Sequence, residues 1–418
     1  MKAGVKMSNT DYILNLLDIT DENIKPYEVY NTFIKNIRTK IIKAKLSYKP
    51  GRCPDCGLCA QIKNGFKEVT YDINSLNGIP YRLRLFKQRF YCKNCHSSHF
   101  ARSPFLNFNS IFTQDIIERI IQLAQDSLTL KEIAKLVGAS PSSVNRILYK
   151  NSHYHWHHKP LPHNLSFDEF SIKKNEYAFI GIDADTHKQL VLLPDRKKKT
   201  IIEFFLNQYS LYERQQVETV TVDMNADYAT YAHQLFPNAE IIIDRFHIIQ
   251  LIQRTLTDAR VLTVKQTEDH HNRTYKALKT HWRLFNKSET LLDAQHIKYY
   301  RGLNEYTTQQ NIVDLGLQYN PEFSRVYQAY QTILNAVQTK NFQAIEHLLD
   351  TYTPSNSPLD VTIRTLKRNR HYIKNALEYP FSNGPIEGLN RKIKTLKRNC
   401  YGFKNVQHFF TRIQLILG

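Results

Sequence analysis

Hydrophobic residues recur with different periods along this chain, and the changes of period divide it into regions. Residues 8–48 carry apolar side chains at roughly helical spacing, which predicts a small helical lead-in. Between Pro80 and Tyr91 the apolar residues alternate with basic ones, as in a basic β-hairpin. Residues 113–149 return to the helical period. From Leu165 onward, strand-like runs alternate with helical stretches, so we expect a multidomain α+β protein.

The region that begins at Leu165 has a specific order of elements. Three strand-like runs come first, and two more then alternate with three helices. This order predicts a mixed sheet with helices on its faces, which is the ribonuclease-H-like arrangement. The expected strands are 164–173, 177–183, 189–193, 217–223 and 240–244, and the expected helices are 198–208, 228–236 and 246–262.

The last third of the chain is basic, rich in Tyr and helical in pattern. Residues 263–380 show no strand signals and predict an all-helical insertion, with Trp282 in its core or, alternatively, stacked on an unpaired base. Gly384-Pro385 then predicts the start of another helix, with Glu387 in its first turn, where the helix dipole favours a carboxylate. A solvated surface helix is the alternative for this segment. Its basic residues, which we expect to bind DNA, are Arg391, Lys394, Lys397 and Arg398.

Charge changes this picture by pointing to a polyanion. The 418 residues include 57 Lys plus Arg and 38 Asp plus Glu, for a formal net charge of +19, and nucleic acid is the usual partner of such a chain. A membrane surface is the rival partner, but no apolar run approaches the length of a spanning helix. The polar N-terminus predicts no signal peptide, so we expect a cytoplasmic, nucleoid-associated protein and no membrane partner.

Two Cys-x-x-Cys motifs flank the predicted hairpin. Together they can supply four thiolates in a tetrahedron, which predicts one structural Zn²⁺ in a zinc ribbon. A redox pair or two unrelated turns are the alternatives. Cys59, His96 and His99 are expected to be bystanders. The expected ligands are Cys53, Cys56, Cys92 and Cys95.

The helical region 113–149 has the signals of a helix-turn-helix. Thr129 and Glu132 form a capping box, and Ser140 followed by Pro141 starts the last helix, which would enter the major groove. An ordinary three-helix bundle is the alternative. The His-rich stretch 151–163 is interpreted as an extended linker rather than a metal site. The outward residues expected to contact DNA are Ser142, Ser143, Asn145 and Arg146.

Three carboxylates stand where a ribonuclease-H-like sheet would bring them together. Asp168 lies in the first expected strand, Asp223 ends the fourth, and a helix packed on that edge can add Glu387. A single Asp at a strand end is more often a turn former or helix cap. Three carboxylates together can hold two Mg²⁺ ions, or Mn²⁺ in their place, for an in-line displacement at phosphorus.

Four motifs resemble those of the DDE transposases of bacterial insertion sequences, and most closely the ISL-three family. They are Ser166-Phe167-Asp168-Glu169, Val222-Asp223-Met224, Asp244-Arg245-Phe246-His247 and Ser382-Asn383-Gly384-Pro385-Ile386-Glu387-Gly388. The resemblance covers almost the whole chain. It implies a catalytic triad of Asp168, Asp223 and Glu387, with supporting roles for Asp244 and His247.

The resemblance also implies an activity: binding of the terminal inverted repeats of an element, followed by cleavage and transfer of DNA strands. The partners are then double-stranded DNA, both element ends and target, and we expect a homodimer on it. A non-catalytic DNA-binding regulator and a ribonuclease-H-like nuclease without strand transfer are the alternatives. The expected domains are a lead-in (1–48), zinc ribbon (49–105), helix-turn-helix (110–150), linker (151–163), split catalytic domain (164–262 and 381–418) and insertion (263–380).

Overall fold

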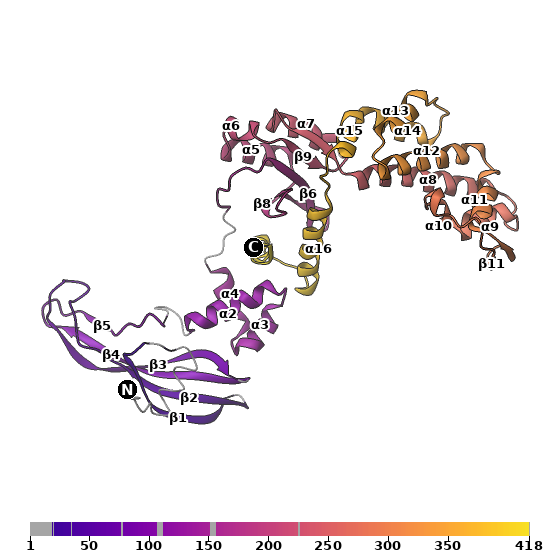
Figure 1. Cartoon of the computed structure of the whole chain (residues 1–418). Coiled ribbons are helices and arrows are strands. Elements are labelled where there is room, and N and C mark those ends of the chain that lie inside the picture. The colour runs from indigo at the N-terminus through magenta and orange to yellow at the C-terminus, as the bar shows by residue number, and fades with distance from the viewer. Residues whose placement is uncertain are drawn as a thin grey trace, which may run out of the picture. The chain divides into compact units, whose positions relative to one another are not determined.

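The computed structural model describes residues 19, 21–34, 36–76, 78–106, 112–150, 156–224 and 226–417, without the side chains of 74–76, 226 and 227 (Figure 1). The chain divides into two compact units. The first comprises Met1–His155 with Ile393–Gly418, and the second comprises Trp156–Lys392. Half of the apolar positions used to predict the N-terminal lead-in lie outside the described residues, namely Ile13, Leu14, Leu16 and Leu17, and so do His153 and His155 of the linker.

A five-stranded sheet begins the first unit. Its order is β1-β2-β4-β3, with the short β5 paired to β4, and only the β2–β4 pair is parallel. The predicted basic stretch Pro80–Tyr91 lies within one strand, β4, and the hairpin forms with the preceding strand β3, to which β4 is antiparallel. The strands are β1 (Ile24–Ile34), β2 (Ile37–Leu46), β3 (Gln61–Leu76), β4 (Ile79–Cys92) and β5 (Ser98–Phe100).

The helical lead-in predicted over 1–48 is wrong wherever the structure describes it, because residues 24–46 form β1 and β2. Ile42, Ala44 and Leu46 are fully buried at every second position, which is the period of a strand. Ile37, which belonged to the apparent helical face, is 56% exposed. The two strands form an antiparallel hairpin, and β2 also pairs with β4 further along the chain, a pairing that local spacing does not reveal.

Helices complete the first unit, and the predicted helix signals are confirmed there. The Thr129–Glu132 capping box forms, Gly138 takes the left-handed conformation that ends α3 (φ 71°), and Ser140 caps α4. A helix from the end of the chain packs against α2, and Arg412 donates a 2.9 Å hydrogen bond to the Leu128 carbonyl. The helices are α2 (Gln114–Gln125), α3 (Leu130–Val137), α4 (Pro141–Tyr149) and α17 (Val406–Leu417).

That packing changes the expected assignment of 381–418. Residues 393–418 group with the N-terminal unit, so this segment does not lie wholly with the sheet that carries Asp168. The reason is an apolar face on α17: Phe409, Phe410 and Ile413 are buried, and Leu415 packs against the core of the three helices.

The second unit is built on the mixed sheet that the sequence predicted. Its order is β10-β9-β6-β7-β8, with β6, β9 and β10 parallel and β7 and β8 antiparallel. Helices α5 and α7 share one buried cluster with the strands. The elements are β6 (Asn164–Lys173), β7 (Glu176–Asp183), β8 (Gln189–Leu193), α5 (Lys198–Gln208), α6 (Leu211–Gln215), β9 (Thr219–Val222), α7 (Ala226–Leu235), β10 (Glu240–Ile243) and α8 (Arg245–Gln266).

The region after α8 is mainly helical, but the prediction that it is all helical is wrong. Strands β11 and β12 pair as a short antiparallel hairpin, with Tyr299 opposite Tyr306. Tyr and Thr favour strands, and Asn304 in the turn takes a positive φ of 58°. The elements are α9 (Arg273–Thr280), α10 (Trp282–Phe285), η1 (Glu289–Leu291), β11 (Lys298–Tyr300), β12 (Glu305–Thr307), α11 (Gln309–Leu317), α12 (Pro321–Gln338), α13 (Phe342–Thr351), α14 (Pro358–Arg368), α15 (Arg370–Glu378) and α16 (Gly384–Asn399).

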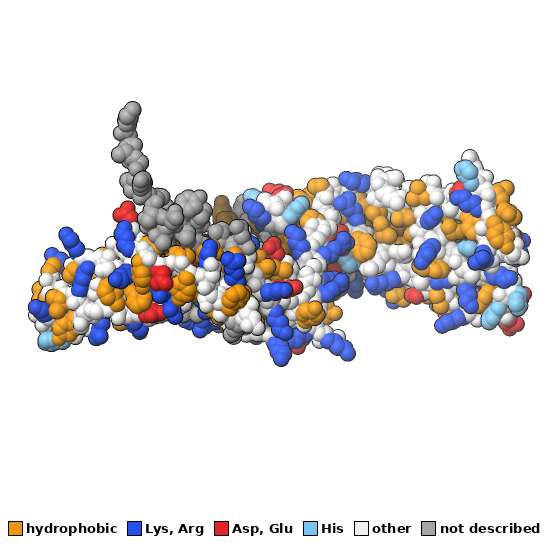
Figure 2. Space-filling model, turned by 90° about the horizontal axis from the view of Figure 1, so that it is seen from below, with side chains coloured by type: hydrophobic (Ala, Val, Ile, Leu, Met, Phe, Trp, Pro, Cys, Tyr) orange, Lys and Arg blue, Asp and Glu red, His pale blue; other side chains and the backbone are white. Residues whose placement is uncertain are grey.

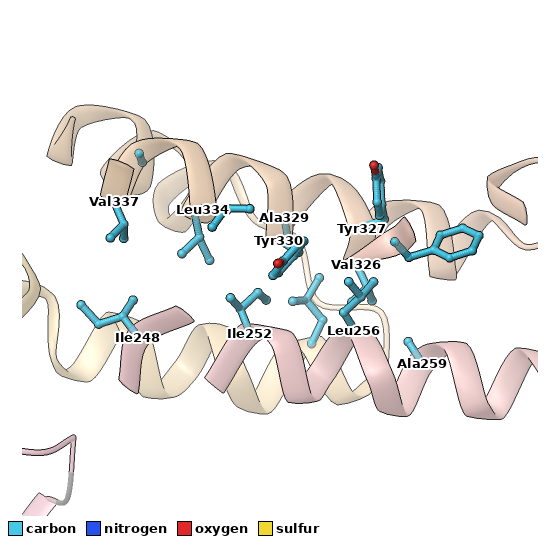
Figure 3. Close-up of a cluster of buried hydrophobic side chains, with 14 of the residues drawn as sticks. Ile248, Ile252, Leu256, Ala259, Val326, Tyr327, Ala329, Tyr330, Leu334 and Val337 are labelled. Atoms are coloured by element: carbon cyan, nitrogen blue, oxygen red, sulfur yellow. The ribbon is translucent and has the colours of Figure 1, made fainter. Parts of the chain in front are cut away.

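Helix α8 joins the sheet to this helical region. Its apolar residues recur every three or four positions and face α12, which runs alongside (Figure 3). The prediction that Trp282 lies in the core of this region is wrong. Its side chain is 39% exposed, and the guanidinium groups of Arg260 and Arg283 lie over its ring. The facing residues are Ile248, Ile252, Leu256 and Ala259 of α8 and Val326, Tyr330, Leu334 and Val337 of α12.

Basic side chains are spread over both units on the face shown in Figure 2. Over the residues described, we find no helix with the length and apolar character needed to cross a membrane.

Candidate carboxylate and cysteine metal sites

Parallel strands place three aspartates side by side in the second unit. Asp223 directly follows β9, Asp244 directly follows β10, and Asp168 lies within β6. Ser166 pairs with Thr221 and Val222 pairs with Ile243. Continuing these registers by one or two residues sets Asp168 level with Asp223, and Asp223 level with Asp244. The sequence predicted that Asp168 and Asp223 lie side by side at the strand ends, and the structure adds Asp244 next to them.

The start of α16 is fastened to these aspartates by two asparagines. The Asn383 side-chain amide donates to Asp223 Oδ1 at 3.1 Å, and its backbone N–H donates to Asp244 Oδ1 at 3.3 Å. The Asn390 amide donates to Asp168 Oδ2 at 2.7 Å. Both asparagines are buried. Sequence reasoning did not assign them to the site, although 383, 387 and 390 have the spacing of one helix face.

The aspartates crowd negative charge into a partly buried space. Burial, and then the charge of Asp223, raise the pKa of Asp168 to about 7. Burial also raises the pKa of Asp244. His247 Nε2 lies 2.9 Å from Asp223 Oδ1, and this hydrogen bond raises the pKa of the imidazole. The site holds more carboxylate charge than its one histidine can balance, so a cation would be favoured there.

Ligand atoms of Asp244, His247 and Glu387 lie within 4.8 Å of one another. Within the described part of the chain, Asp168, Asp223 and Glu387 do not form a group that close. The side-chain oxygens of Asn383 and Asn390 are buried and have no hydrogen-bond partner among the residues that the structure describes, so both are acceptors that an ion or its water could use. This oxygen-rich set with one imidazole fits Mg²⁺ or Mn²⁺.

Neighbouring acids have other partners. Glu169 forms an ion pair with Arg196 and accepts a 2.8 Å hydrogen bond from the Tyr228 hydroxyl, which ties it to the surrounding fold. Glu387 lies 3.8 Å from Arg391 one helical turn later, and its side chain is 38% exposed. Glu387 is therefore the most accessible of the acids that the sequence placed in the site, whereas Glu169 is held away from it.

The first unit holds the predicted cysteine cluster. The Sγ atoms of Cys53 and Cys95 are 3.5 Å apart and those of Cys56 and Cys92 are 3.7 Å apart, with all four within 4.8 Å. Four sulfurs at about 2.3 Å from a tetrahedral zinc would be separated by about 3.8 Å. The cluster therefore has the spacing of a four-thiolate zinc site, as the two motifs predicted.

Two similar turns build this cluster. Gly57 donates its backbone N–H to the Cys53 carbonyl and His96 donates to the Cys92 carbonyl, and both residues have a positive φ. The Ser97 hydroxyl, followed by backbone N–H groups, lowers the pKa of Cys53 to about 5. Burial and the thiols of Cys95 and Cys92 raise the pKa of Cys56 to about 11. The Cys53 thiol therefore ionises before the Cys56 thiol, and a metal would favour the thiolate form of both.

The residues expected to be bystanders lie outside this four-cysteine group. Cys59 is exposed, and the Tyr91 hydroxyl lies 2.7 Å from His96 Nδ1. His99 Nε2 lies 3.2 Å from Asp55. His99 and Asp55 do form a second close group with Cys53, but it shares its only thiol with the first.

The residues expected to contact DNA lie on α4 and α16. Ser142 and Arg146 are exposed on α4, whereas Ser143 and Asn145 are half-buried. Ser143 also receives a hydrogen bond from Ser140, the helix cap. On α16, Arg391, Lys394 and Arg398 are exposed and Lys397 is half-buried.

The sequence was compared with known protein families and with curated proteins. The model of a family described as "Transposase", of the ISL-three type, matches residues 165–413, which is more than half of the chain. The matched range includes the carboxylates and the histidine of the site, which are Asp168, Asp223, Asp244, His247 and Glu387. It begins after the cysteine cluster and the predicted helix-turn-helix.

Three relatives illustrate the likeness. The transposase for insertion sequence element IS1001 of Bordetella parapertussis is 24% identical over 388 residues, covering 90% of this chain and 91% of that protein. The transposase for IS1557 of Mycobacterium tuberculosis is 22% identical over 268 residues, covering 61% of this chain and 60% of that protein. A Lactococcus lactis protein described as "ATP-dependent protease" is 37% identical over 120 residues, covering 29% of this chain and 39% of that protein.

The chain thus spans less than two thirds of the Lactococcus and Mycobacterium relatives and nearly all of the Bordetella one.

Proposed function

This chain belongs to the ISL-three family of transposases, and we propose that it binds the terminal inverted repeats of an insertion sequence and cleaves and transfers DNA strands there. The observation that carries the proposal is the alignment of Asp168, Asp223 and Asp244 on adjacent parallel strands, with α16 bringing Glu387 beside Asp244 and His247. The strand order β10-β9-β6-β7-β8 supports a ribonuclease-H-like assignment for this sheet.

Asp168, Asp223 and Glu387 are proposed as the catalytic triad and as the residues that hold two divalent cations. Bound there, the cations would activate the attacking water or 3′-hydroxyl and stabilise the leaving oxygen. Asp168 and Asp223 repel one another, so positive charge nearby would stabilise both carboxylates. Glu387 is half-buried and lies 3.8 Å from Arg391 on the same helix.

Asp244 and His247 act as supporting residues in this scheme. His247 orients Asp223 through their 2.9 Å contact, and Asp244 receives the Asn383 backbone N–H that starts α16. Their close grouping with Glu387 makes Asp244 and His247 candidates for direct ligands of one cation as well. A variant at either position should therefore alter metal dependence as well as rate.

The first unit is proposed to find the DNA. One structural Zn²⁺ on Cys53, Cys56, Cys92 and Cys95 would hold the two turns at the end of the β3–β4 hairpin, and α4 would enter the major groove of a terminal repeat. The exposed cations of α16 would bind DNA phosphates. We further propose a homodimer on DNA and a cytoplasmic, nucleoid-associated location.

The test compares cutting with binding. Glu387→Gln keeps the size of the side chain and removes its charge, so cleavage of a terminal-repeat duplex in Mg²⁺ should fall at least 100-fold, as when preorganised charge stabilisation is removed. A gel shift on the same duplex should be unchanged. Glu378 is an exposed glutamate on α15, and Glu378→Gln is the matched control. It should cut and bind the duplex like the parent protein.

The products separate the competing functions. Cleavage and joining by the parent protein support a transposase. Cleavage without joining would indicate a nuclease, and binding without cleavage would indicate a regulator. Cutting by Glu387→Gln at the parent's rate would refute the triad.

A further inference from the structure

A hollow of about 510 Å³ opens next to the carboxylate site in the second unit. Asp223 and His247 belong to both the site and the hollow. The rest of its lining comes mainly from α8 and α14, helices that also pack against one another. The hollow therefore connects the carboxylates with the helical region that follows the sheet, a region whose role no sequence motif indicates.

Two arginines line this hollow, Arg254 on α8 and Arg368 at the end of α14. Both are exposed, and neither has an ion-pair partner among the residues described. Other arginines of the same unit, such as Arg370 and Arg273, are paired with carboxylates. Two unpaired guanidinium groups in one concavity are suited to a phosphate, which accepts their planar hydrogen bonds.

The remaining lining suits the other parts of a nucleotide. Met224 and Leu251 are partly buried against the core of the helical region and offer an apolar surface. Gln250 adds a side-chain amide that can both donate and accept. The volume lies within the range of about 300–1,000 Å³ that is typical of pockets for ligands of small-molecule size. A single nucleotide is of that size, whereas intact duplex DNA is far too wide.

We propose that this hollow holds one nucleotide of the DNA strand next to the phosphodiester that is cut. Its phosphate would bind Arg254 and Arg368, and its sugar or base would pack against Met224 and Leu251. The proposal rests on the proposed function, because Asp223 at the edge of the hollow marks where the cut phosphodiester would lie. The helical region would then serve to fix the position of the strand relative to the carboxylates.

The first experiment locates the phosphate. Terminal-repeat duplexes would each carry one neutral methylphosphonate at successive positions around the cut, and the full-length protein would be assayed for cleavage. For the parent, neutralising the phosphate held by Arg254 and Arg368 should slow cleavage about tenfold, as expected for lost hydrogen bonds between charged groups. The double variant Arg254→Ala with Arg368→Ala should cut the unmodified duplex about tenfold more slowly than the parent does. Its cleavage rate should not fall further when the duplex carries that methylphosphonate.

Arg364→Ala is the matched control, since Arg364 is an exposed arginine on α14 that does not line the hollow. It should cut like the parent and stay sensitive to the same methylphosphonate. The proposal is overturned if the double variant cuts like the parent, or if it remains as sensitive to every methylphosphonate as the parent. Because both arginines are exposed, thermal unfolding of the double variant should match the parent's.

A second experiment does not depend on cleavage. Fluorescence anisotropy with a labelled twelve-residue oligothymidine would measure single-strand binding by the parent and both variants at several salt concentrations. The double variant should bind about tenfold more weakly, with a shallower dependence of affinity on salt, and Arg364→Ala should change less. A parent that binds in this arginine-dependent way but cuts no DNA would refute the proposed function and leave the pocket standing. Equal affinities and slopes for all three proteins would refute the pocket.

Discussion

The two candidate metal sites of this protein are built in opposite ways. The cysteine site takes its ligands from two short motifs at the ends of a hairpin, and each turn orders its own pair through local backbone hydrogen bonds. The carboxylate site collects residues from three strands and two helices that are far apart in the chain. In the first site, four thiols would occupy all four positions around a tetrahedral ion. The second keeps half-buried Glu387, two amide oxygens without a hydrogen-bond partner among the described residues, and a hollow beside it.

This difference teaches what each site is for. A closed site of four soft ligands stabilises a fold and does no chemistry, because no position is left for a substrate. An open site of crowded carboxylates costs stability until a cation arrives, and that cost is usual at sites of reaction. We therefore expect removal of a ligand to have different consequences in the two units.

The largest expected effect is loss of folding around the cysteines. Cys92→Ser should abolish zinc binding and unfold the region around the β3–β4 hairpin, because zinc bound by four thiolates typically contributes on the order of 10 kcal/mol to small modules. Metal analysis of the purified protein, with hydrogen exchange of the hairpin amides, measures this. Cys59→Ser, which changes an exposed neighbour, should retain zinc. A parent protein free of zinc would remove the basis for the comparison.

A smaller effect is expected where α16 is fastened to the strands. Asn383→Ala removes the hydrogen bond to Asp223 from a buried position and should cost about 2–3 kcal/mol, as for hydrogen bonds to charged groups. Urea unfolding of the second unit would report the loss, and cleavage should fall with it. Asn399→Ala on the exposed side of α16 should change neither. Unaltered stability of Asn383→Ala would show that the helix is held by other contacts.

DNA recognition extends the comparison to a third measurement. Arg146→Ala on α4 should weaken binding to terminal repeats by about 1–3 kcal/mol if the guanidinium contacts a guanine edge, without changing either metal content. Titration at several salt concentrations distinguishes this from a phosphate contact, which would weaken binding to all sequences alike. Arg119→Ala on α2 serves as the control. Equal affinity of Arg146→Ala and the parent would show that α4 does not read the DNA.

The last prediction concerns the ionisation of Asp168. Its pKa is raised to about 7 in the folded metal-free protein, while the unfolded chain releases the same proton near pH 4. Between these values the folded state binds more protons, so stability is expected to fall as pH rises from about 4 to 7. Asp168→Asn should therefore raise the melting temperature of metal-free protein by a few degrees at pH 8 and not at pH 4.

Mg²⁺ should raise the melting temperature of the parent at pH 8 and have less effect on Asp168→Asn. Asp258→Asn, which changes an exposed acid on α8, should behave like the parent throughout. If the melting temperature of the metal-free parent does not change between pH 4 and pH 8, the pKa of Asp168 is not raised by folding.

Sequence reasoning succeeded where the signal was local. The Thr129–Glu132 capping box, the paired Cys-x-x-Cys motifs and the strand runs from Leu165 onward each depend on residues a few positions apart, and the structure confirms them. It failed for the β1–β2 hairpin, in which β2 also pairs with the later strand β4, and for the β11–β12 hairpin, whose strands have three residues each. Short or remotely paired strands leave little periodic pattern.

The site shows the same division. The strand-end positions of Asp168 and Asp223 follow from local pattern and sheet order. The hydrogen bonds of Asn383 and Asn390 depend on how α16 packs, which no short stretch of sequence encodes. The triad itself stays a prediction.

The position of α17 has a consequence for the order of synthesis. Its buried Arg412 and Phe409 complete a unit that begins at the other end of the chain, whereas Asp168, Asp223 and Glu387 all precede it. Because a ribosome makes the chain from its N-terminus, α2 waits for its partner helix until the carboxylates have already been made. A product of premature termination after Glu387 would carry the carboxylates without the helix that supports α2.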